Sequence, residues 1–173
     1  MRLLTPENPR QLSAELRRAR SPDMRRRRGI IALSLLAGAC TAVVACYQSG
    51  LVRHVPEPRL RRFNADRVDA IPEAYSFLST PDSFLALLSY SLTALLAAMG
   101  GADRARSRPL LPLALMGKIA VDCAMAGWLT WFQWSRLRAF CSWCLLTTAA
   151  TFASLPLALP EARRALGAIK GRH

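Results

Sequence analysis

Long apolar stretches alternate with short polar, arginine-rich ones along this chain. The apolar stretches lie at about 29–47, 81–99, 109–131 and 139–159. Each approaches the roughly 20 residues that an α-helix needs to cross a lipid bilayer. The pattern therefore predicts an all-α integral membrane protein, a bundle of four transmembrane helices within residues 29–160.

Polar segments fill both ends and the connections. A basic tail precedes the bundle at 1–28, and a second follows at 161–173. The longest connection runs from Gln48 to Thr80, between the first and second spans, and connections this long are often functional. Within it, residues 69–78 mix apolar side chains with acids, which predicts a short helix on the membrane surface. Thr80-Pro81-Asp82 predicts the start of the second span, because a hydroxyl, a proline and an acid favour a helix N-terminus.

Charge predicts the orientation of the bundle. The formal net charge is +13 although 52% of the residues are hydrophobic, so charge and apolarity are segregated along the chain. With four spans, the N-terminal tail, the 101–109 connection and the C-terminal tail share one side, and all three are arginine-rich. The positive-inside rule makes that side cytoplasmic. Because the arginines flank apolar runs, we interpret them as membrane topology signals and not as a nucleic-acid-binding surface.

The first apolar run has a second interpretation, as a cleaved signal. Residues 37–40, Ala-Gly-Ala-Cys, loosely resemble a lipoprotein cleavage site. However, leucine is absent at the third position before Cys40, and the apolar run continues beyond it. We therefore expect an uncleaved span, in which Cys40 is a small core residue and Cys46 lies near the outer end.

Two charged residues interrupt the third span. Lys118 and Asp122 are four positions apart and share one helix face. Charges inside a membrane are costly and usually face a partner, a cavity or each other. We favour a mutually satisfied pair, with a proton-handling role as the alternative.

The candidate chemistry lies at the head of the fourth span, in Phe140-Cys141-Ser142-Trp143-Cys144. Two thiols three positions apart at a helix start share one face and are close enough to form a disulfide. Cys141 would lie nearest the helix N-terminus, where unpaired N–H groups and the helix dipole favour an anion. Such a site lowers a cysteine pKa from about 8.5 into the reactive range. Arg136 and Arg138 are expected to act in the same direction.

Several features favour a redox role for this thiol pair. Tryptophans surround the connection before it, as in an interfacial aromatic belt: Trp128, Trp131, Trp134 and Trp143. A structural zinc site usually takes four ligands, but the chain offers only two histidines and three other, scattered thiols. The pair would face the outside, where disulfides persist. The odd count of five cysteines excludes complete pairing within one chain.

The arrangement resembles the vitamin K epoxide reductase family over roughly residues 29–160. The resemblance is carried by four spans, a long outer loop after the first, and F-C-x-x-C opening the fourth. Apolar and hydroxyl residues also follow Cys144, at Leu145, Leu146 and Thr147. Residues 47–50, the loop and residues 80–101 are similar to bacterial members. The resemblance implies an enzyme of disulfide-bond formation in the bacterial inner membrane, with both termini cytoplasmic and the thiols facing the periplasm.

The resemblance also assigns roles. It implies that electrons pass from a thiol substrate or a periplasmic thioredoxin-like partner, through the CxxC disulfide, to a membrane quinone of the ubiquinone or menaquinone type. Cys144 would face the quinone, and Cys141 would exchange with the partner thiol. The residues implied for the quinone pocket are Trp143, Thr147, Asp82 and Ser83, with Trp134 and Trp143 closing it over the ring.

The loop departs from the family pattern. Family members carry a cysteine pair there, whereas residues 48–80 contain none. Either the partner thiol attacks Cys141 directly, which we favour, or Cys46 replaces a loop cysteine, or the protein is no disulfide relay. Two other functions stay open. One is a thiol-based membrane metal carrier using Cys46, Cys123 and Cys141, because soft metals suit thiolates. The other is a non-catalytic membrane scaffold.

Overall fold

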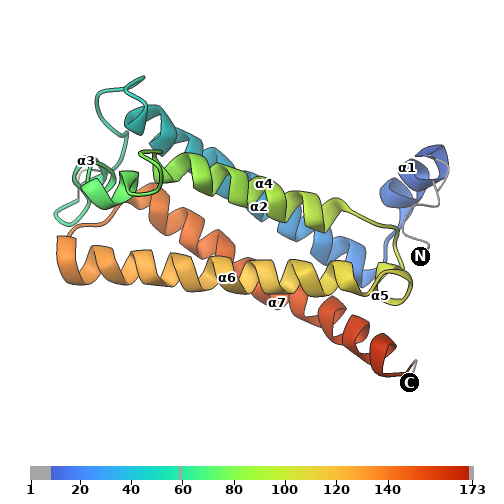
Figure 1. Ribbon diagram of the computed structural model, residues 1–173. Helices are drawn as coiled ribbons and strands as arrows, with labels where there is room; N and C mark the ends of the chain where they lie inside the picture. Colours follow the sequence, from blue (N-terminus) through green and yellow to red (C-terminus); the bar gives the residue numbers. More distant parts are fainter. Residues whose placement is uncertain (1–8, 59, 172–173) are drawn as a thin grey trace.

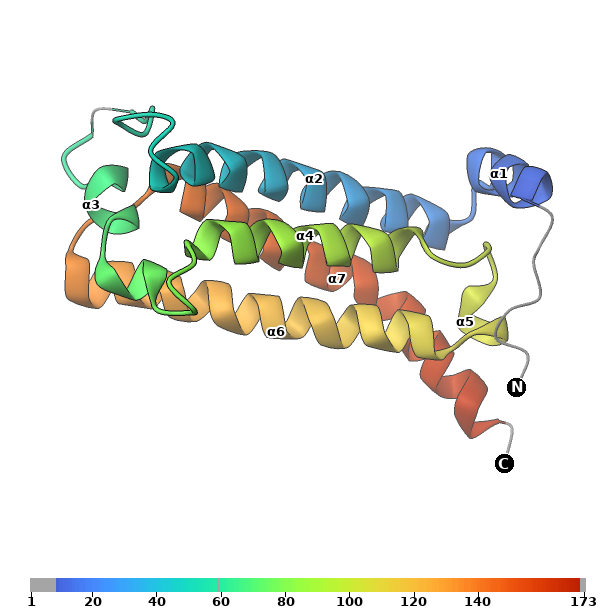
Figure 2. The same cartoon turned by 45° about the horizontal axis from the view of Figure 1, so that its top comes forward.

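Four helices form a bundle in the computed structural model, which describes residues 9–58 and 60–171. They are α2 (Pro22–Gln48), α4 (Asp82–Ala98), α6 (Leu110–Phe132) and α7 (Ser142–Lys170), and they run along one another (Figures 1 and 2). Three of the helical segments, Pro22–Gln48, Leu110–Leu137 and Ser142–Lys170, are long and apolar enough to cross a membrane, and α4 is a shorter apolar helix. The predicted all-α, four-helix architecture is confirmed.

The bundle has two distinct ends, which we call the loop end and the termini end. Two short helices lie at the loop end, α3 (Ala65–Asp69) and the 3₁₀ helix η1 (Pro72–Tyr75). A π-helical turn, η2 (Gln133–Leu137), continues α6 at the same end. The helices α1 (Pro9–Arg18) and α5 (Arg104–Ser107) lie at the other end, together with the start of α2 and the end of α7 (Figure 1). The N-terminal segment, the 101–109 connection and the C-terminal segment thus share one end, as the charge pattern required.

Small and aliphatic side chains let the helices approach closely in the core. One cluster of buried residues joins all four long helices: Ile30, Ala97, Leu115, Ile119, Cys123 and Ala158. Cys40 is also buried, as expected for a small core residue. Van der Waals packing of such side chains, at the density of a protein interior, holds the helices together.

Three predicted boundaries differ from the structure. The surface helix expected at 69–78 is instead two short helices, α3 and η1. The helix α2 begins at Pro22, seven residues before the apolar run, because Ser21 caps it and proline suits its first turn. The helix α7 continues through Pro156 and Pro160 to Lys170. Each proline removes one backbone hydrogen bond, but packing beyond Pro160 holds the helix, since Ala162 and Ala165 are buried.

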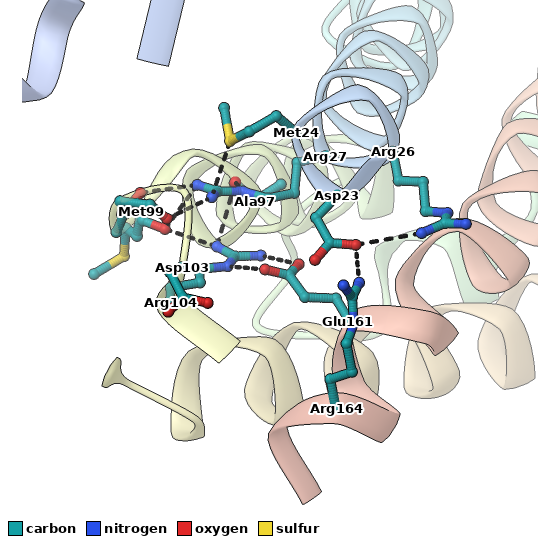
Figure 3. Close-up of polar contacts among 12 residues, drawn as sticks. Asp23, Met24, Arg26, Arg27, Ala97, Met99, Asp103, Arg104, Glu161 and Arg164 are labelled. Atoms are coloured by element: carbon teal, nitrogen blue, oxygen red, sulfur yellow. Dashed lines mark hydrogen bonds and ion pairs between the residues drawn. The ribbon is translucent and has the colours of Figure 1, made fainter. Parts of the chain in front are cut away.

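Parts of both basic segments pack against the bundle, namely Arg27 and the part of α7 after Pro160. The Arg27 guanidinium is buried and donates to the carbonyls that end α4, among them Ala97 at 2.8 Å and Met99 at 3.0 Å. Those carbonyls have no partner within their own helix, so the arginine satisfies them. Figure 3 shows this group beside Glu161, whose carboxylate accepts from Arg104. Charged residues that we interpreted as topology signals therefore also contribute buried polar contacts at the termini end.

Candidate active site at the loop end of the bundle

The two thiols of the CxxC motif lie at the N-terminus of α7. Cys141 is the N-cap residue, and its sulfur accepts a hydrogen bond of 3.3 Å from the backbone N–H of Cys144. The sulfur thus occupies the place that a capping oxygen normally takes. Cys141 is completely buried, whereas Cys144 is partly exposed. Both are free thiols in this structure, as are the other three cysteines.

Arg136 and Arg138 do not contact the thiols by any hydrogen bond or ion pair in the described residues, although the sequence suggested that they support a thiolate. Both are exposed. Arg138 has a left-handed backbone conformation, with φ of 54°, where the chain turns from η2 towards α7. Its side chain lines a small surface pocket together with Arg62, Trp134 and Phe140. Trp134 belongs to that pocket, with Arg62 stacked 5.7 Å from its ring centre, and not to the cavity described below.

A segment of the long loop covers Cys141. We call it the strap and define it as residues 55–58 and 60–65. It pairs with the backbone just before the motif: Phe140 N donates to Arg62 O at 2.8 Å, and Asn64 N donates to Phe140 O at 3.0 Å. The indole N–H of Trp143 donates to Pro56 O at 2.6 Å. These hydrogen bonds hold the strap against the start of α7.

Glu57 fastens the strap at its centre. Its Oε1 accepts from Ala65 N at 2.5 Å, and its Oε2 accepts from the backbone N–H and the hydroxyl of Ser142 at 3.5 and 3.4 Å. A carboxylate suits this place because the first N–H groups of α7 carry partial positive charge. Cys141 packs with Val55 of the strap and with Val68 of α3 in an apolar cluster. Direct attack by an outside thiol therefore requires the strap to move.

Cys144 opens onto a cavity of about 430 Å³ between the loop, α4, α6 and α7. The four residues that the family resemblance implied for the quinone pocket all line it, namely Trp143, Thr147, Asp82 and Ser83. The rest of the wall is mostly apolar and includes Leu85, Met125 and Leu129. Cys141 is not among the lining residues. The two thiols consequently face different surroundings, one the cavity and the other the strap.

Asp69, at the end of α3, touches the thiol that faces the cavity. The sulfur of Cys144 donates to Asp69 Oδ1 at 3.6 Å. The carboxylate is buried, and its Oδ2 has no hydrogen-bond partner among the described residues. Burial raises the pKa of Asp69 to about 6, with the nearby charge of Asp82 adding to the increase and the contact with Cys141 opposing it. Sequence reasoning missed this residue, because it is one of several acids in the loop and no local pattern distinguishes it from the others.

Gln48, the last residue of α2, joins the loop to the start of α4. Its Nε2 donates to the backbone oxygen of Asp69 at 3.0 Å and to Asp82 Oδ1 at 2.9 Å. Its Oε1 accepts from Ser83 N at 3.3 Å. The hydroxyl of Ser83 is buried and has no hydrogen-bond partner within the described part of the chain. Among the described residues, the cavity lining thus contains two unpaired buried polar atoms, the Ser83 hydroxyl and Asp69 Oδ2. The hydroxyl can donate to a carbonyl oxygen such as that of a quinone, and the carboxyl group can do so when it is protonated.

The charged pair of the third span is satisfied within the bundle. Lys118 Nζ lies 2.6 and 2.7 Å from the two oxygens of Asp122. The hydroxyls of Ser89 and Thr93, on α4, donate to the same carboxylate at 3.0 and 3.2 Å. These contacts tie α6 to α4 and support the interpretation as a structural pair.

The remaining cysteines do not extend the thiol pair. In the part of the chain that the structure describes, neither Cys46 nor Cys123 joins Cys141 in a group of three or more potential ligand atoms. Cys123 is buried, and its thiol donates to Thr151 O at 3.6 Å. This arrangement does not support the predicted path for a metal ion along Cys46, Cys123 and Cys141.

The model of the vitamin K epoxide reductase family matches residues 29–159, which is more than half of the chain and includes the thiol pair. No curated protein matches the chain.

Proposed function

We propose, because this chain belongs to the vitamin K epoxide reductase family of thiol-disulfide and quinone reductases, that it is a quinone-linked thiol oxidase. Electrons enter as a thiol substrate or a thioredoxin-like partner reduces a Cys141–Cys144 disulfide. They leave as the dithiol reduces a quinone of the ubiquinone or menaquinone type. The net result is a disulfide in the partner.

One observation carries the proposal. Cys144 lines the cavity together with Trp143, Thr147, Asp82 and Ser83, while Cys141 lies on the other side of the pair, under the strap. A relay needs such a division, because one sulfur must reach the electron acceptor and the other must reach the donor. The four residues that the family resemblance implies for the pocket come from two helices that are distant in sequence, α4 and α7.

The cavity suits a quinone head group in size and chemistry. Its volume of about 430 Å³ falls in the usual range for small-molecule sites. The Ser83 hydroxyl is positioned to donate to a carbonyl oxygen, and the indole of Trp143 offers an apolar face. When bound, a quinone supplies an acceptor for two electrons and two protons.

The strap governs how electrons enter. Cys141 is completely buried, so a partner thiol reaches its sulfur only after the strap leaves Phe140 and Ser142. The strap is held by hydrogen bonds and one carboxylate rather than by a disulfide, in keeping with the absence of cysteine from residues 48–80. We propose that a docking partner displaces it and attacks Cys141 directly, without a shuttle through Cys46.

The chain is a multi-pass membrane protein. We propose that it lies in a bacterial inner membrane with the termini end in the cytoplasm. The Arg-rich segments at that end support this orientation by the positive-inside rule. The thiols then face the periplasm, where disulfides form.

The test uses purified full-length protein with dithiothreitol as donor and ubiquinone-1 or a menaquinone analogue as acceptor. The wild type is expected to reduce quinone, and Cys144→Ala and Cys141→Ala are expected to abolish the reaction. Cys123→Ala is the matched control. It removes a buried thiol that lies in α6, outside the thiol pair, and should leave turnover intact. When it is incubated with an oxidised donor disulfide, Cys144→Ala should retain a mixed disulfide on Cys141, because the thiol that would resolve it is missing. Wild-type turnover in Cys144→Ala would exclude the relay, and a wild type without quinone reduction would favour a scaffold.

A further inference from the structure

One carboxylate at the loop end contacts a reacting sulfur. Cys144 Sγ lies 3.6 Å from Asp69 Oδ1, and Asp69 Oδ2 has no partner among the described residues. The side chain is only 6% exposed. A buried carboxylate oxygen without a partner loses its hydration without compensation, so such groups are rare and usually have a ligand or a chemical role.

The other acids near the cavity are already engaged. Asp82 accepts from Gln48 Nε2 at 2.9 Å and begins α4 at an exposed position. Asp122 is held by Lys118, with Lys118 Nζ within 2.7 Å of both oxygens. Glu57 accepts from the backbone of the strap and of α7. Of these acids, Asp69 combines a contact with sulfur and an oxygen that remains available.

Tertiary contacts hold Asp69 in place. Asn64 caps α3 by accepting from Arg67 N at 2.9 Å, and Gln48 Nε2 donates to the backbone oxygen of Asp69 at 3.0 Å. Val68, the preceding residue, packs in the same cluster as Cys141. The carboxylate is therefore positioned against Cys144 before any ligand binds, which is what a proton-transfer group needs.

We propose that Asp69 is a catalytic residue that accepts the proton of the Cys144 thiol and donates it to a quinone oxygen in the adjoining cavity. This inference rests on the proposed function, and it names the proton path within the same site. It also explains why Asp69, in the cavity lining, has a second oxygen for which the described residues supply no hydrogen bond.

The reaction balances with Asp69 in this role. Two S–H bonds break, one S–S bond forms between Cys141 and Cys144, and two electrons and two protons pass to the quinone, which leaves as the quinol. Asp69 takes the proton when the Cys144 S–H bond breaks. The neutral acid then gives that proton to the oxygen and returns to the carboxylate. The second proton comes from the Cys141 thiol, so no further reductant or acid is required.

The charge environment suits a proton carrier. The titratable groups facing Asp69 are Cys141 and Cys144 from α7, Asp82 from α4, Glu57 from the strap and Tyr47 from α2. Burial raises its pKa to about 6, and the contact with Cys141 limits the rise. At neutral pH the group is mainly a carboxylate, able to accept a proton. Its conjugate acid is stronger than a thiol, so it can also release that proton to an oxygen.

The first test does not depend on quinone. The reduced full-length protein is alkylated with iodoacetamide over a pH series from about 4.5 to 8, and modification of Cys144 is followed by mass spectrometry of its peptide. A base of pKa about 6 predicts an inflection near that pH in the wild-type rate. Asp69→Asn should lose the inflection, whereas Asp69→Glu, which keeps a carboxylate, should retain it.

Asp103→Asn is the matched control, because it removes the same charge from an exposed position at the termini end of the bundle, and its inflection should stay. An unchanged inflection in Asp69→Asn overturns the inference. If Asp69→Asn does not fold, the inference is still overturned when the alkylation rate of the wild type or of Asp69→Glu shows no inflection with pH.

The second test separates this inference from the proposed function. In single-turnover oxidation of the thiol pair by ubiquinone-1, Asp69→Asn should slow electron transfer about 100-fold, the range for loss of a general base. Quinone binding, measured by tryptophan quenching, should change less than about threefold. Equal rates in Asp69→Asn and wild type refute the role of Asp69 and leave the relay intact. If the wild type transfers no electrons to quinone but its alkylation inflection depends on Asp69, the relay is refuted. The role of Asp69 as the proton acceptor of Cys144 then still stands.

Discussion

Arg104 and Glu161, 57 positions apart in the chain, form a bidentate ion pair at the termini end of the bundle. Arg104 Nε lies 2.8 Å from Glu161 Oε1, and its second terminal nitrogen lies 2.9 Å from Oε2. Both side chains are buried. Arg104 also donates to the carbonyls of Leu96 and Met99 at 2.7 Å. One residue of the short helix α5 thus joins the end of α4 to α7 (Figure 3).

The two partners of this pair should differ in how much stability each contributes. Arg104→Met leaves the Glu161 carboxylate buried without its cation and should destabilise the protein by about 3–5 kcal/mol. Glu161→Gln leaves Arg104 with its carbonyl acceptors, so we expect a smaller loss. Thermal unfolding in detergent measures both, with Arg163→Met, an exposed position on the same helix, as the control. Equal losses in the two variants would contradict this ranking.

The strap should control access to Cys141. In the reduced protein, Cys141 is expected to be alkylated far more slowly than Cys144, because it is completely buried. Glu57→Ala removes the carboxylate that holds the strap to Ala65 and Ser142. Hydrogen bonds to a charged group contribute about 1.5–3 kcal/mol, so Cys141 alkylation should accelerate roughly 10- to 100-fold.

Peptide-resolved mass spectrometry after timed alkylation measures this effect. Glu73→Ala, which removes an exposed carboxylate of the same loop, should leave the Cys141 rate unchanged. If Glu57→Ala and Glu73→Ala gave the same rate as the wild type, the strap would not be the barrier.

The Lys118–Asp122 pair should behave as a structural unit. Asp122→Asn leaves Lys118 in the bundle without its counter-charge, and the expected loss is about 3–5 kcal/mol. Replacing both residues with apolar ones, Lys118→Met with Asp122→Leu, removes the two charges together and should cost less than the single change. Thermal unfolding in detergent measures all the variants. A double variant as stable as expected but inactive in quinone reduction would favour the proton-handling alternative.

Asp69 should make stability depend on pH in acid solution. Its pKa is about 6 in the folded protein, above the ordinary value of 3.8, so the folded state holds this proton more tightly than the unfolded state. The resulting stability is fully present below about pH 4 and is lost as pH rises through 6. A shift of about two units corresponds to roughly 3 kcal/mol.

Asp69→Asn removes this contribution. The unfolding temperature of the wild type should therefore fall relative to that of Asp69→Asn as the pH rises from about 4 to 7. Comparing the two proteins cancels the titration of groups that they share, such as Glu57 and Asp82. A constant difference between the two curves would contradict the raised pKa.

Local features of the sequence were sufficient to predict the bundle. The thickness of the bilayer sets the length of each apolar run. The difference between its cytoplasmic and outer sides determines which connections are rich in arginine. These constraints act along the chain, so they can be read without knowing which helices touch. The position of the CxxC motif at the head of α7 follows from the same pattern, because the apolar run begins just before it. The four expected pocket residues came from family resemblance and lie together in the structure.

Only the tertiary structure decided which polar side chains work together. Asp69 meets Cys144 across 75 positions, Glu57 meets Ser142 across 85, and Arg27 meets the end of α4 across more than 70. In the sequence, each of these residues is one of many similar charges in a loop or a tail. Their roles arise because folding buries them, and a buried charge must find a partner or acquire an altered pKa. Which partner it finds depends on the helix packing and the loop path, and neither is encoded in any short stretch of the chain.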